Sequence, residues 1–273
     1  MITYNGAKVK PTIFPDGTSQ VWNIDLVNSA DIVWHYENEQ ELIWLYQLLE
    51  LVLMQEKYVE VYIPYLPYAR QDKQVHNDAS FAGNALIPLL TSFSFPIHTL
   101  DVHNNVFDGV TNHKPFVPNW HDCVVFPDAG AEVRYGETFA TKPTAVGRKV
   151  RDQATGWIKS YELVTDVDIY GRVLVVDDLC DGGATFNILA ESLKEHKDID
   201  EVDLWVTHGV FSKGLSELAD NYGHVHTTDS YFPNFGENAL TDKDRAVQFE
   251  GARDTGFLKV YSAMDMINET KNW

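Results

Sequence analysis

The sequence is poor in cysteine, in positive charge and in long apolar runs, and each shortage excludes a class of protein. Its 273 residues include only Cys123 and Cys180, which cannot build a disulfide framework or a four-cysteine zinc site. No apolar run reaches the roughly 18 residues that a membrane-spanning helix requires. The first residues lack the basic and apolar regions of a secretory signal peptide. We therefore expect a cytoplasmic protein in a reducing compartment, with no membrane partner.

Positive charge is the scarcest feature of the composition. The chain has 21 Lys and Arg residues against 40 Asp and Glu residues, a formal net charge of −19. Proteins that bind nucleic acid do so through clustered cations, so we expect no nucleic-acid partner. An acidic chain does not attract free phosphate either. A phosphorylated ligand would need metal ions and a few well-placed cations to neutralise it.

What the sequence does contain is an alternation of short apolar runs with segments of helical periodicity. The pattern predicts strands at 32–34, 59–64, 97–102, 123–126, 144–147, 172–176 and 202–208, and helices at 39–56, 81–90 and 185–195. Such alternation predicts an α/β fold of mainly parallel sheets flanked by helices. The proline-bearing stretch 112–120 is the best boundary. We therefore expect two α/β domains, 1–118 and 119–273.

Polar segments follow four of the predicted strands. They are Arg70-Gln71-Asp72, His103-Asn104-Asn105, Asp128-Ala129-Gly130 and the segment from Asp177 to Thr185. Ligands of open α/β sheets bind at the carboxyl ends of the strands. Random surface polarity would not respect strand direction, so this distribution indicates binding or catalysis at the strand ends.

The segment Val-Val-Asp-Asp-Leu-Cys-Asp-Gly-Gly-Ala-Thr-Phe at 175–186 carries the most chemistry. Its adjacent carboxylates, Asp177 and Asp178, can accept hydrogen bonds from vicinal ribose hydroxyls. The glycines let backbone N–H groups approach a phosphate, and the helix beginning near Thr185 adds its dipole and unpaired donors. The plain alternative is a strand-to-helix turn with Asp and Thr as caps. The order of the parts favours a site for a 5-phosphorylated ribose.

This segment resembles the signature of phosphoribosyltransferases and of ribose-phosphate pyrophosphokinases, and other segments select the second family. The matching segments are Phe14-Pro15-Asp16-Gly17, the run from Tyr65 to Lys73, Leu100-Asp101-Val102-His103, Phe126-Pro127-Asp128-Ala129-Gly130, the run from Ala145 to Arg151 and Thr207-His208-Gly209-Val210-Phe211. They occur in the family's order over most of the chain. The chain is thus similar to a short, divergent ribose-phosphate pyrophosphokinase.

The resemblance implies two phosphoribosyltransferase-like domains and a Mg²⁺-dependent transfer of the β,γ-diphosphate of ATP. The implied acceptor is the anomeric hydroxyl of ribose 5-phosphate, and the products are phosphoribosyl pyrophosphate and AMP. Such catalysis is mostly positioning and charge neutralisation. The resemblance also implies a homo-oligomer, because the family completes its adenine site across a subunit interface and tends toward hexamers built from dimers.

The same resemblance assigns roles to individual residues. The implied catalytic cations are Lys149 and Arg151. The implied ATP-binding residues are Phe14, Asp16, Arg70, Gln71, Asp72 and His103. The implied ribose-phosphate-binding residues are Asp177, Asp178, Asp181, Gly182, Gly183, Ala184 and Thr185, and His103 and Asp128 would lie at the metal. On spacing alone, Lys149 and Arg151 are more typical of an ordinary basic loop, and a single His at a strand end is more often structural.

Departures from the family pattern leave the acceptor open. Thr18 replaces an acid after Asp16, Gly182 replaces a hydroxyl residue, and Ala184 replaces a glycine. A phosphodiester has one charge fewer than a terminal phosphate and needs room for its second arm, so these changes also fit ADP-ribose, whose diphosphorylation would serve NAD salvage. Two further alternatives are a phosphoribosyltransferase, which would have no need of the segment 67–72, and a non-catalytic regulatory relative, which would have lost the acids and cations that are present here. The polar stretch 148–171 is expected to be a mobile lid.

Overall fold

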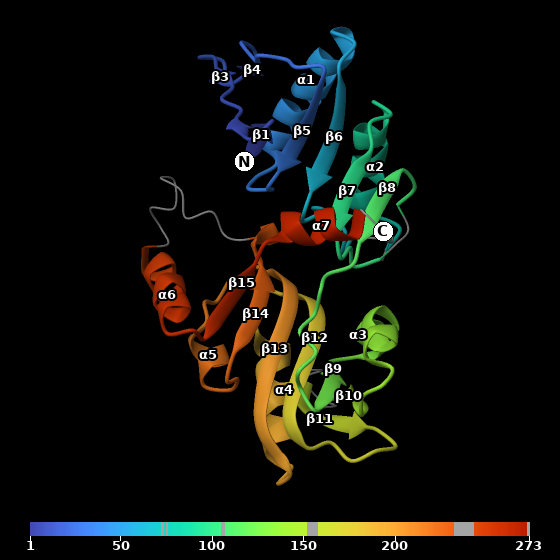
Figure 1. Ribbon diagram of the computed structural model, residues 1–273, viewed down its shortest axis with the longest axis vertical. Helices are drawn as coiled ribbons and strands as arrows, with labels where there is room; N and C mark the ends of the chain where they lie inside the picture. The colour runs from blue at the N-terminus through green and yellow to red at the C-terminus, as the bar shows by residue number, and fades with distance from the viewer. Residues whose placement is uncertain (72–73, 75, 105–106, 152–157, 232–242, 272–273) are drawn as a thin grey trace. The chain divides into compact units, whose positions relative to one another are not determined.

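The computed structural model describes residues 1–71, 74, 76–104, 107–151, 158–231 and 243–271. The chain divides into two compact units (Figure 1). Unit 1 comprises residues 1–115 together with helix α7 (Ala263–Lys271), and unit 2 comprises residues 116–262. The sequence led us to expect the final residues in the second domain. The structure differs because Thr270 and Lys271 of α7 bond to residues of unit 1.

Unit 1 contains a six-stranded sheet in the order β2-β1-β5-β6-β7-β8 and a separate β3–β4 hairpin. The strands are β1 (Ile2–Tyr4), β2 (Ala7–Lys8), β3 (Thr12–Ile13), β4 (Ser19–Gln20), β5 (Ser29–Trp34), β6 (Tyr58–Ile63), β7 (Ile97–Leu100) and β8 (Val110–His113). Strands β5 to β8 are parallel to one another, and β1 joins β5 antiparallel. The carboxyl ends of β6 and β7 therefore lie at one edge of the sheet.

Helices α1 (Gln40–Met54) and α2 (Ala82–Thr91) share one apolar core with this sheet. Helix α1 buries Leu45, Leu48, Leu49 and Val52, the residues that recur at helical spacing in the sequence. Helix α7 contacts β7 and β8, and its Thr270 hydroxyl lies 2.8 Å from Nδ1 of His113. Lys271 of α7 pairs with Glu60 on β6.

Unit 2 contains a seven-stranded sheet in the order β11-β10-β9-β12-β13-β14-β15. The strands are β9 (Cys123–Phe126), β10 (Thr144–Arg151), β11 (Ile158–Val164), β12 (Gly171–Cys180), β13 (Ile199–Gly209), β14 (Val225–Thr228) and β15 (Leu258–Tyr261). The helices are α3 (Ala129–Tyr135), α4 (Ala184–Lys194), α5 (Ser216–Ala219) and α6 (Lys243–Asp254), with 3₁₀ turns η1 (Gly136–Phe139) and η2 (Asp229–Tyr231). All pairings are parallel except β10 with β11.

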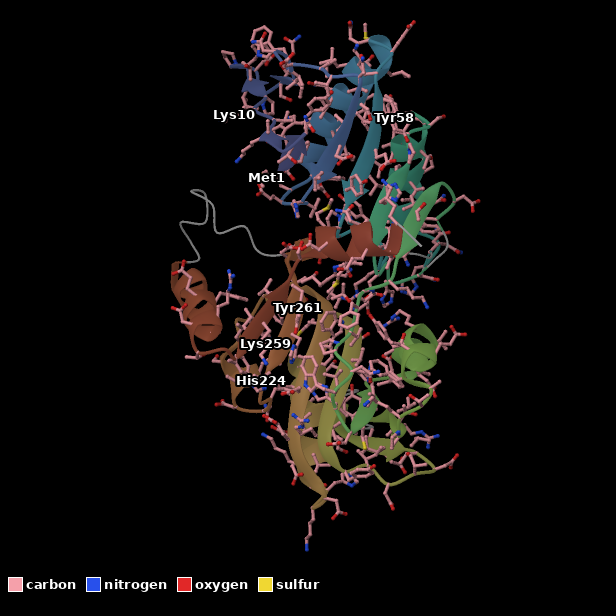
Figure 2. All side chains as sticks on the ribbon, in the orientation of Figure 1. Met1, Lys10, Tyr58, His224, Lys259 and Tyr261 are labelled. Atoms are coloured by element: carbon pink, nitrogen blue, oxygen red, sulfur yellow. The ribbon has the colours of Figure 1, made fainter. Side chains whose placement is uncertain are left out.

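The two faces of the unit 2 sheet differ in their cover. Helix α4 packs its Leu189 and Leu193 with the buried Val173 and Val175 of β12 in the main core of this unit. Helix α3 and η1 lie over β9, β10 and β12, where Phe126 contacts Phe139. At the β15 end of this sheet lie His224, which precedes β14, and Lys259 and Tyr261 of β15; all three are labelled in Figure 2.

The expected α/β class is confirmed, with parallel-dominated sheets and flanking helices. The expectation for the stretch 148–171 needs correction. Strand β10 continues through Arg151, and residues 158–164 return beside it as β11, so only residues 152–157 between the two strands lie outside the described part. Of the helices that the structure describes, none is both long enough and apolar enough to cross a membrane.

Candidate functional site

The predicted polar loops lie at the carboxyl ends of parallel strands in both units. Those after β6 and β7 belong to unit 1, and those after β9 and at the end of β12 belong to unit 2. Strand direction determines this placement, because parallel neighbours end at the same edge of a sheet. The candidate residues are therefore grouped within each unit.

The acid pair at the end of β12 is held by an arginine that the sequence patterns did not single out. Arg134 Nη2 on α3 donates to Oδ1 of Asp178 at 2.8 Å and also bonds to Oδ1 of Asp177. The backbone N–H of Asp178 donates to Asp177 Oδ1 at 2.8 Å. Asp178 is buried, and Asp177 and Arg134 are partly buried. One guanidinium thus compensates two adjacent carboxylates that have little access to water.

Burial raises the pKa of Asp177 well above its ordinary value, and the neighbouring charge of Asp178 raises it further. The cation of Arg134 acts in the opposite direction. Arg134 is therefore the group that favours ionisation of Asp177, against burial and the charge of Asp178. An ionised carboxylate accepts hydrogen bonds from donating sugar hydroxyls.

Asp128 and Lys149 form a second charged group beside the acid pair. Asp128 begins α3 by accepting from the N–H groups of Gly130 and Ala131, at 3.0 and 3.2 Å. Its Oδ2 lies 3.2 Å from Lys149 Nζ on β10. Burial alone would raise the pKa of Asp128, but the Ala131 N–H and Lys149 outweigh it and lower the pKa. The side chain of Arg151, the other expected catalytic cation, lies outside the described residues.

Asp128 and Arg134 approach the same point on α3. A Cβ added to Gly130 would lie 3.2 Å from Asp128 Oδ1 and 3.5 Å from Arg134 Nη1. Helix α3 thus connects the Lys149 group with the acid pair. The structure brings Asp128, Lys149, Asp177 and Asp178 together through this helix.

The loop after the acid pair turns into α4 at Gly183, whose φ of +78° lies in the left-handed region that glycine tolerates. Asp181 and Ala184 are exposed, and Gly182 and Thr185 are partly exposed. The helix was expected from Thr185 and begins at Ala184, so the predicted phosphate-binding turn and helix start coincide.

A lysine that the sequence did not single out lies over this turn. A Cβ added to Gly182 would lie 3.4 Å from both Cδ and Cε of Lys213. The loop carrying Lys213 is fixed to the turn because the Ser212 N–H donates to the Asp181 carbonyl at 3.2 Å. The missing side chain at Gly182 makes room for the stem of Lys213.

In unit 1, the loop after β6 exposes Arg70 and Gln71. Asp72 lies outside the described residues. The Gln71 N–H donates to the carbonyl of Tyr68 at 2.8 Å, and Tyr68 adopts a φ of +63°. A Cβ on Gly83 would lie 3.2 Å from the Gln71 carbonyl and 3.0 Å from Cζ of Phe107. The loop after β6 and the segment after β7 therefore meet at the start of α2.

His103 follows β7 and is partly buried. The N–H of the preceding Val102 donates to Asn112 Oδ1 on β8 at 3.0 Å, and the Asp101 N–H donates to the His113 carbonyl at 2.8 Å. These bonds fix the start of the loop to β8. They place His103 at the same edge of unit 1 as Arg70 and Gln71.

Phe14 and Asp16 occupy the turn of the β3–β4 hairpin, and both are exposed. Asp16 Oδ1 accepts from the backbone N–H of Thr18 at 3.0 Å and from its hydroxyl at 2.7 Å. These bonds lower the pKa of Asp16. Thr18, the residue that departs from the family pattern, closes the turn around Asp16.

Comparison with known proteins supports the resemblance. No family model matches the chain. The ribose-phosphate pyrophosphokinase of Thermoplasma acidophilum is 26% identical over 245 residues, which is 82% of this chain and 84% of the relative. The enzyme of the same name from Streptomyces avermitilis is 32% identical over 184 residues, 60% of this chain and 56% of the relative. The crystal structure of phosphoribosylpyrophosphate synthetase from Mycobacterium smegmatis matches with a TM-score of 0.69 at 20% identity, over 97% of this chain and 89% of that one, and shows the shared fold.

The relatives, together with the shared α/β fold, support a diphosphotransferase enzyme. The chain is therefore similar to ribose-phosphate pyrophosphokinases over most of its length.

Proposed function

We propose that this chain is a cytoplasmic, Mg²⁺-dependent enzyme that transfers the β,γ-diphosphate of ATP to the anomeric hydroxyl of ribose 5-phosphate. The products are phosphoribosyl pyrophosphate and AMP. The observation that carries the proposal is the group of Asp177, Asp178 and Arg134 joined through α3 to Asp128 and Lys149. This group supplies acceptors for a sugar, a carboxylate for a metal and a cation for a phosphate.

The chain's own residues would divide the task as follows. Asp177 and Asp178 accept from the ribose hydroxyls and orient the ring, while the N–H groups at the start of α4 receive the 5-phosphate. Lys149 neutralises charge that develops on the transferred phosphoryl group. Four described side chains of the expected ATP loops are exposed and therefore available to the nucleotide. They are Phe14, Asp16, Arg70 and Gln71.

Mg²⁺ would supply neutralisation of the ATP phosphates when bound. Carboxylate oxygen is the ligand type that Mg²⁺ prefers, so Asp128 fits a direct role. His103 offers a nitrogen, which suits Mg²⁺ poorly, and we propose that it acts through water or phosphate. We also propose that the chain forms at least a dimer, because the exposed hairpin carrying Phe14 and Asp16 fits an adenine contact with a neighbouring copy.

Lys213 supports ribose 5-phosphate as the preferred acceptor. A terminal phosphate carries one charge more than a phosphodiester and gains more from an added cation. The phosphate turn lacks a hydroxyl donor at Gly182. Lys213, whose stem lies over Gly182, would supply a donor in its place. ADP-ribose is the second acceptor to test, because the phosphate turn departs from the family pattern at Gly182 and Ala184.

The direct test incubates the purified chain with ATP and Mg²⁺ and either ribose 5-phosphate or ADP-ribose, and measures AMP release. We expect AMP and a diphosphorylated sugar with ribose 5-phosphate. AMP with ADP-ribose alone would reverse the acceptor. A chain that releases no AMP with either acceptor, although circular dichroism shows it folded, would contradict the proposal.

The Lys213→Ala variant tests the phosphate assignment. We expect its KM for ribose 5-phosphate to rise by about tenfold with little change in kcat, since one charge-assisted hydrogen bond contributes roughly 1.5 kcal/mol. The matched control is Lys197→Ala, which removes an exposed lysine elsewhere in unit 2 and should leave both constants unchanged. An unchanged KM in Lys213→Ala would remove this residue from the phosphate site.

A further inference from the structure

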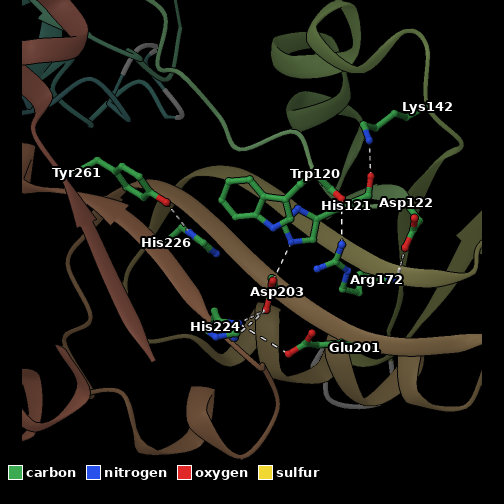
Figure 3. Close-up of polar contacts among 10 residues, drawn as sticks. All are labelled: Trp120, His121, Asp122, Lys142, Arg172, Glu201, Asp203, His224, His226 and Tyr261. Atoms are coloured by element: carbon green, nitrogen blue, oxygen red, sulfur yellow. Dashed lines mark hydrogen bonds and ion pairs between the residues drawn. The ribbon is translucent and has the colours of Figure 1, made fainter. Parts of the chain in front are cut away.

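Four side chains form a staggered array on one face of the unit 2 sheet. Glu201 and Asp203 are two residues apart on β13, and His224, immediately before β14, has the same spacing from His226 on β14. Side chains two apart on a strand lie on the same face. The register pairs Trp205 with His226, which places Asp203 beside His224 (Figure 3).

The ligand atoms of three of these residues already have the spacing of a metal site. His224 Nδ1 lies 3.2 Å from Asp203 Oδ1 and 3.8 Å from Glu201 Oε1, and the three atoms lie within 4.8 Å of one another. Tetrahedral ligands with bonds of about 2.0 Å to a zinc ion lie about 3.3 Å apart. Small side-chain rotations would therefore bring the three atoms to coordinating positions.

Gly223 allows the Glu201 carboxylate to reach this position. A Cβ on Gly223, the residue immediately before His224, would overlap Oε1 of Glu201 at 2.2 Å. Any other residue would push the carboxylate away from the imidazole. The array thus depends on the absence of one side chain.

His226 provides an independent observation. Its side chain is fully buried, its Nδ1 lies 3.0 Å from the hydroxyl of Tyr261, and its Nε2 has no hydrogen-bond partner. Figure 3 shows its ring between Tyr261 and the Asp203–His224 pair, and the ring centroids of His224 and His226 are 6.2 Å apart. A buried imidazole nitrogen with no hydrogen-bond partner is suited to bind a metal.

The other charged neighbours include His121, Lys259 and Arg172, which is the register partner of Glu201 on β12. His121 Nε2 lies 2.8 Å from Oδ2 of Asp203, which leaves Oδ1 toward His224. A second residue that orients a ligating carboxylate is typical of protein metal sites. Lys259 lies opposite His226 on β15, and both Lys259 and Arg172 oppose a bound cation, while the carboxylates of Glu201 and Asp203 balance these two charges.

We propose that Glu201, Asp203 and His224 bind a divalent transition-metal ion of the zinc type, with His226 as a further ligand and His121 as the residue that orients Asp203. Mixed carboxylate and imidazole ligands select such ions over Mg²⁺. The site is separate from the acid pair. Asp203 and Glu201 pair with Leu174 and Arg172, three to five residues before Asp177, or about 10 to 17 Å along β12.

The test titrates the chelator-treated full chain with Zn²⁺ in the presence of excess Mg²⁺, and repeats the titration with Co²⁺ while recording its visible absorption. We expect the wild-type chain to bind one equivalent, with the intense d–d bands of a four-coordinate Co²⁺ site. His224→Ala should weaken binding by about 100-fold and Glu201→Gln by about tenfold. Both residues are partly exposed, so both variants should fold, which urea unfolding checks.

Two controls separate this site from other binding. His196→Ala removes an exposed histidine of the same unit, and Asp128→Asn alters the proposed Mg²⁺ carboxylate; both should bind Zn²⁺ as the wild type does. Absence of Zn²⁺ binding, or equal binding by wild type, His224→Ala and Glu201→Gln, would overturn the proposal. AMP release is measured separately, so loss of the metal site and failure of the proposed reaction give different results.

Discussion

Replacing Arg134 with Met is expected to destabilise the chain by about 3 to 5 kcal/mol, the largest effect on stability that we predict. Removing one partner of a buried ion pair leaves an uncompensated charge in a medium of low polarity. Here one guanidinium serves both Asp177 and Asp178. Without it, the two carboxylates would repel each other, and the already raised pKa of Asp177 would rise further.

Urea unfolding followed by circular dichroism measures this loss, and hydrogen exchange along β12 locates it. Arg148→Met is the matched control, because Arg148 is exposed and its partner Glu162 lies 3.8 Å away at the surface. Such an exposed pair should contribute about 1 kcal/mol or less. Adding Asp177→Asn to Arg134→Met should recover part of the loss. If Arg134→Met unfolds at the same urea concentration as Arg148→Met, the proposed charge compensation is wrong.

Replacing Lys149 with Ala is expected to lower kcat for AMP release by about 10² to 10³-fold, with KM values changed only a few-fold. The expected size is that of removing one pre-organised group that stabilises transition-state charge. The ion pair with Asp128 at 3.2 Å holds the lysine beside the acid pair before substrates arrive. Steady-state kinetics with ATP and ribose 5-phosphate measure the effect.

Lys149→Arg and Arg148→Ala serve as the controls for this experiment. The arginine variant keeps a cation of different shape and should retain part of the rate. Arg148 is the neighbouring residue on the same strand, is exposed and pairs with Glu162, so its removal should leave kcat within a few-fold. Full activity of Lys149→Ala would refute its assignment. A large rise in KM with unchanged kcat would instead indicate that Lys149 contributes to substrate binding alone.

The sequence was sufficient for the elements that follow strong periodic patterns. The predicted strand 123–126 coincides with β9, and the predicted helix 185–195 differs from α4 by one residue at each end. Residues 123–126 form a continuous buried apolar run, and α4 buries apolar side chains at helical spacing. Helix α1 was predicted for the same reason, within one or two residues of its ends.

Elements whose stability comes from distant partners were not predicted. Strand β14 has the sequence Val-His-Thr-Thr, and its two threonines bond to the backbone carbonyl of Thr207 on β13. Strand β11 is polar and is stabilised by its pairing with β10. Local sequence carries little information about such pairing, because the partner strand supplies the hydrogen bonds and the burial.

The candidate site shows the same division between local and distant information. The order of small and acidic residues in the 175–186 segment indicates a phosphoribose loop without knowledge of distances. Arg134 was missed because it lies six residues after Asp128 on a short helix that the sequence did not suggest. Lys213 was missed for a related reason, since only the folded loop brings it to Gly182. The sequence did offer one reason to consider Arg134 as a site residue, because cations are scarce in this acidic chain.

The position of α7 has a consequence for how the protein is synthesised. Unit 1 is discontinuous, since the chain leaves it after Pro115 and returns only at Ala263. During synthesis on the ribosome, residues 1–115 would therefore emerge first, and α7 would become available to them only after the whole of unit 2 has been synthesised. The side of β7 and β8 that α7 covers, including His113, would be open to chaperones during that interval. Folding of residues 1–115 is thus completed by a helix that is synthesised after unit 2.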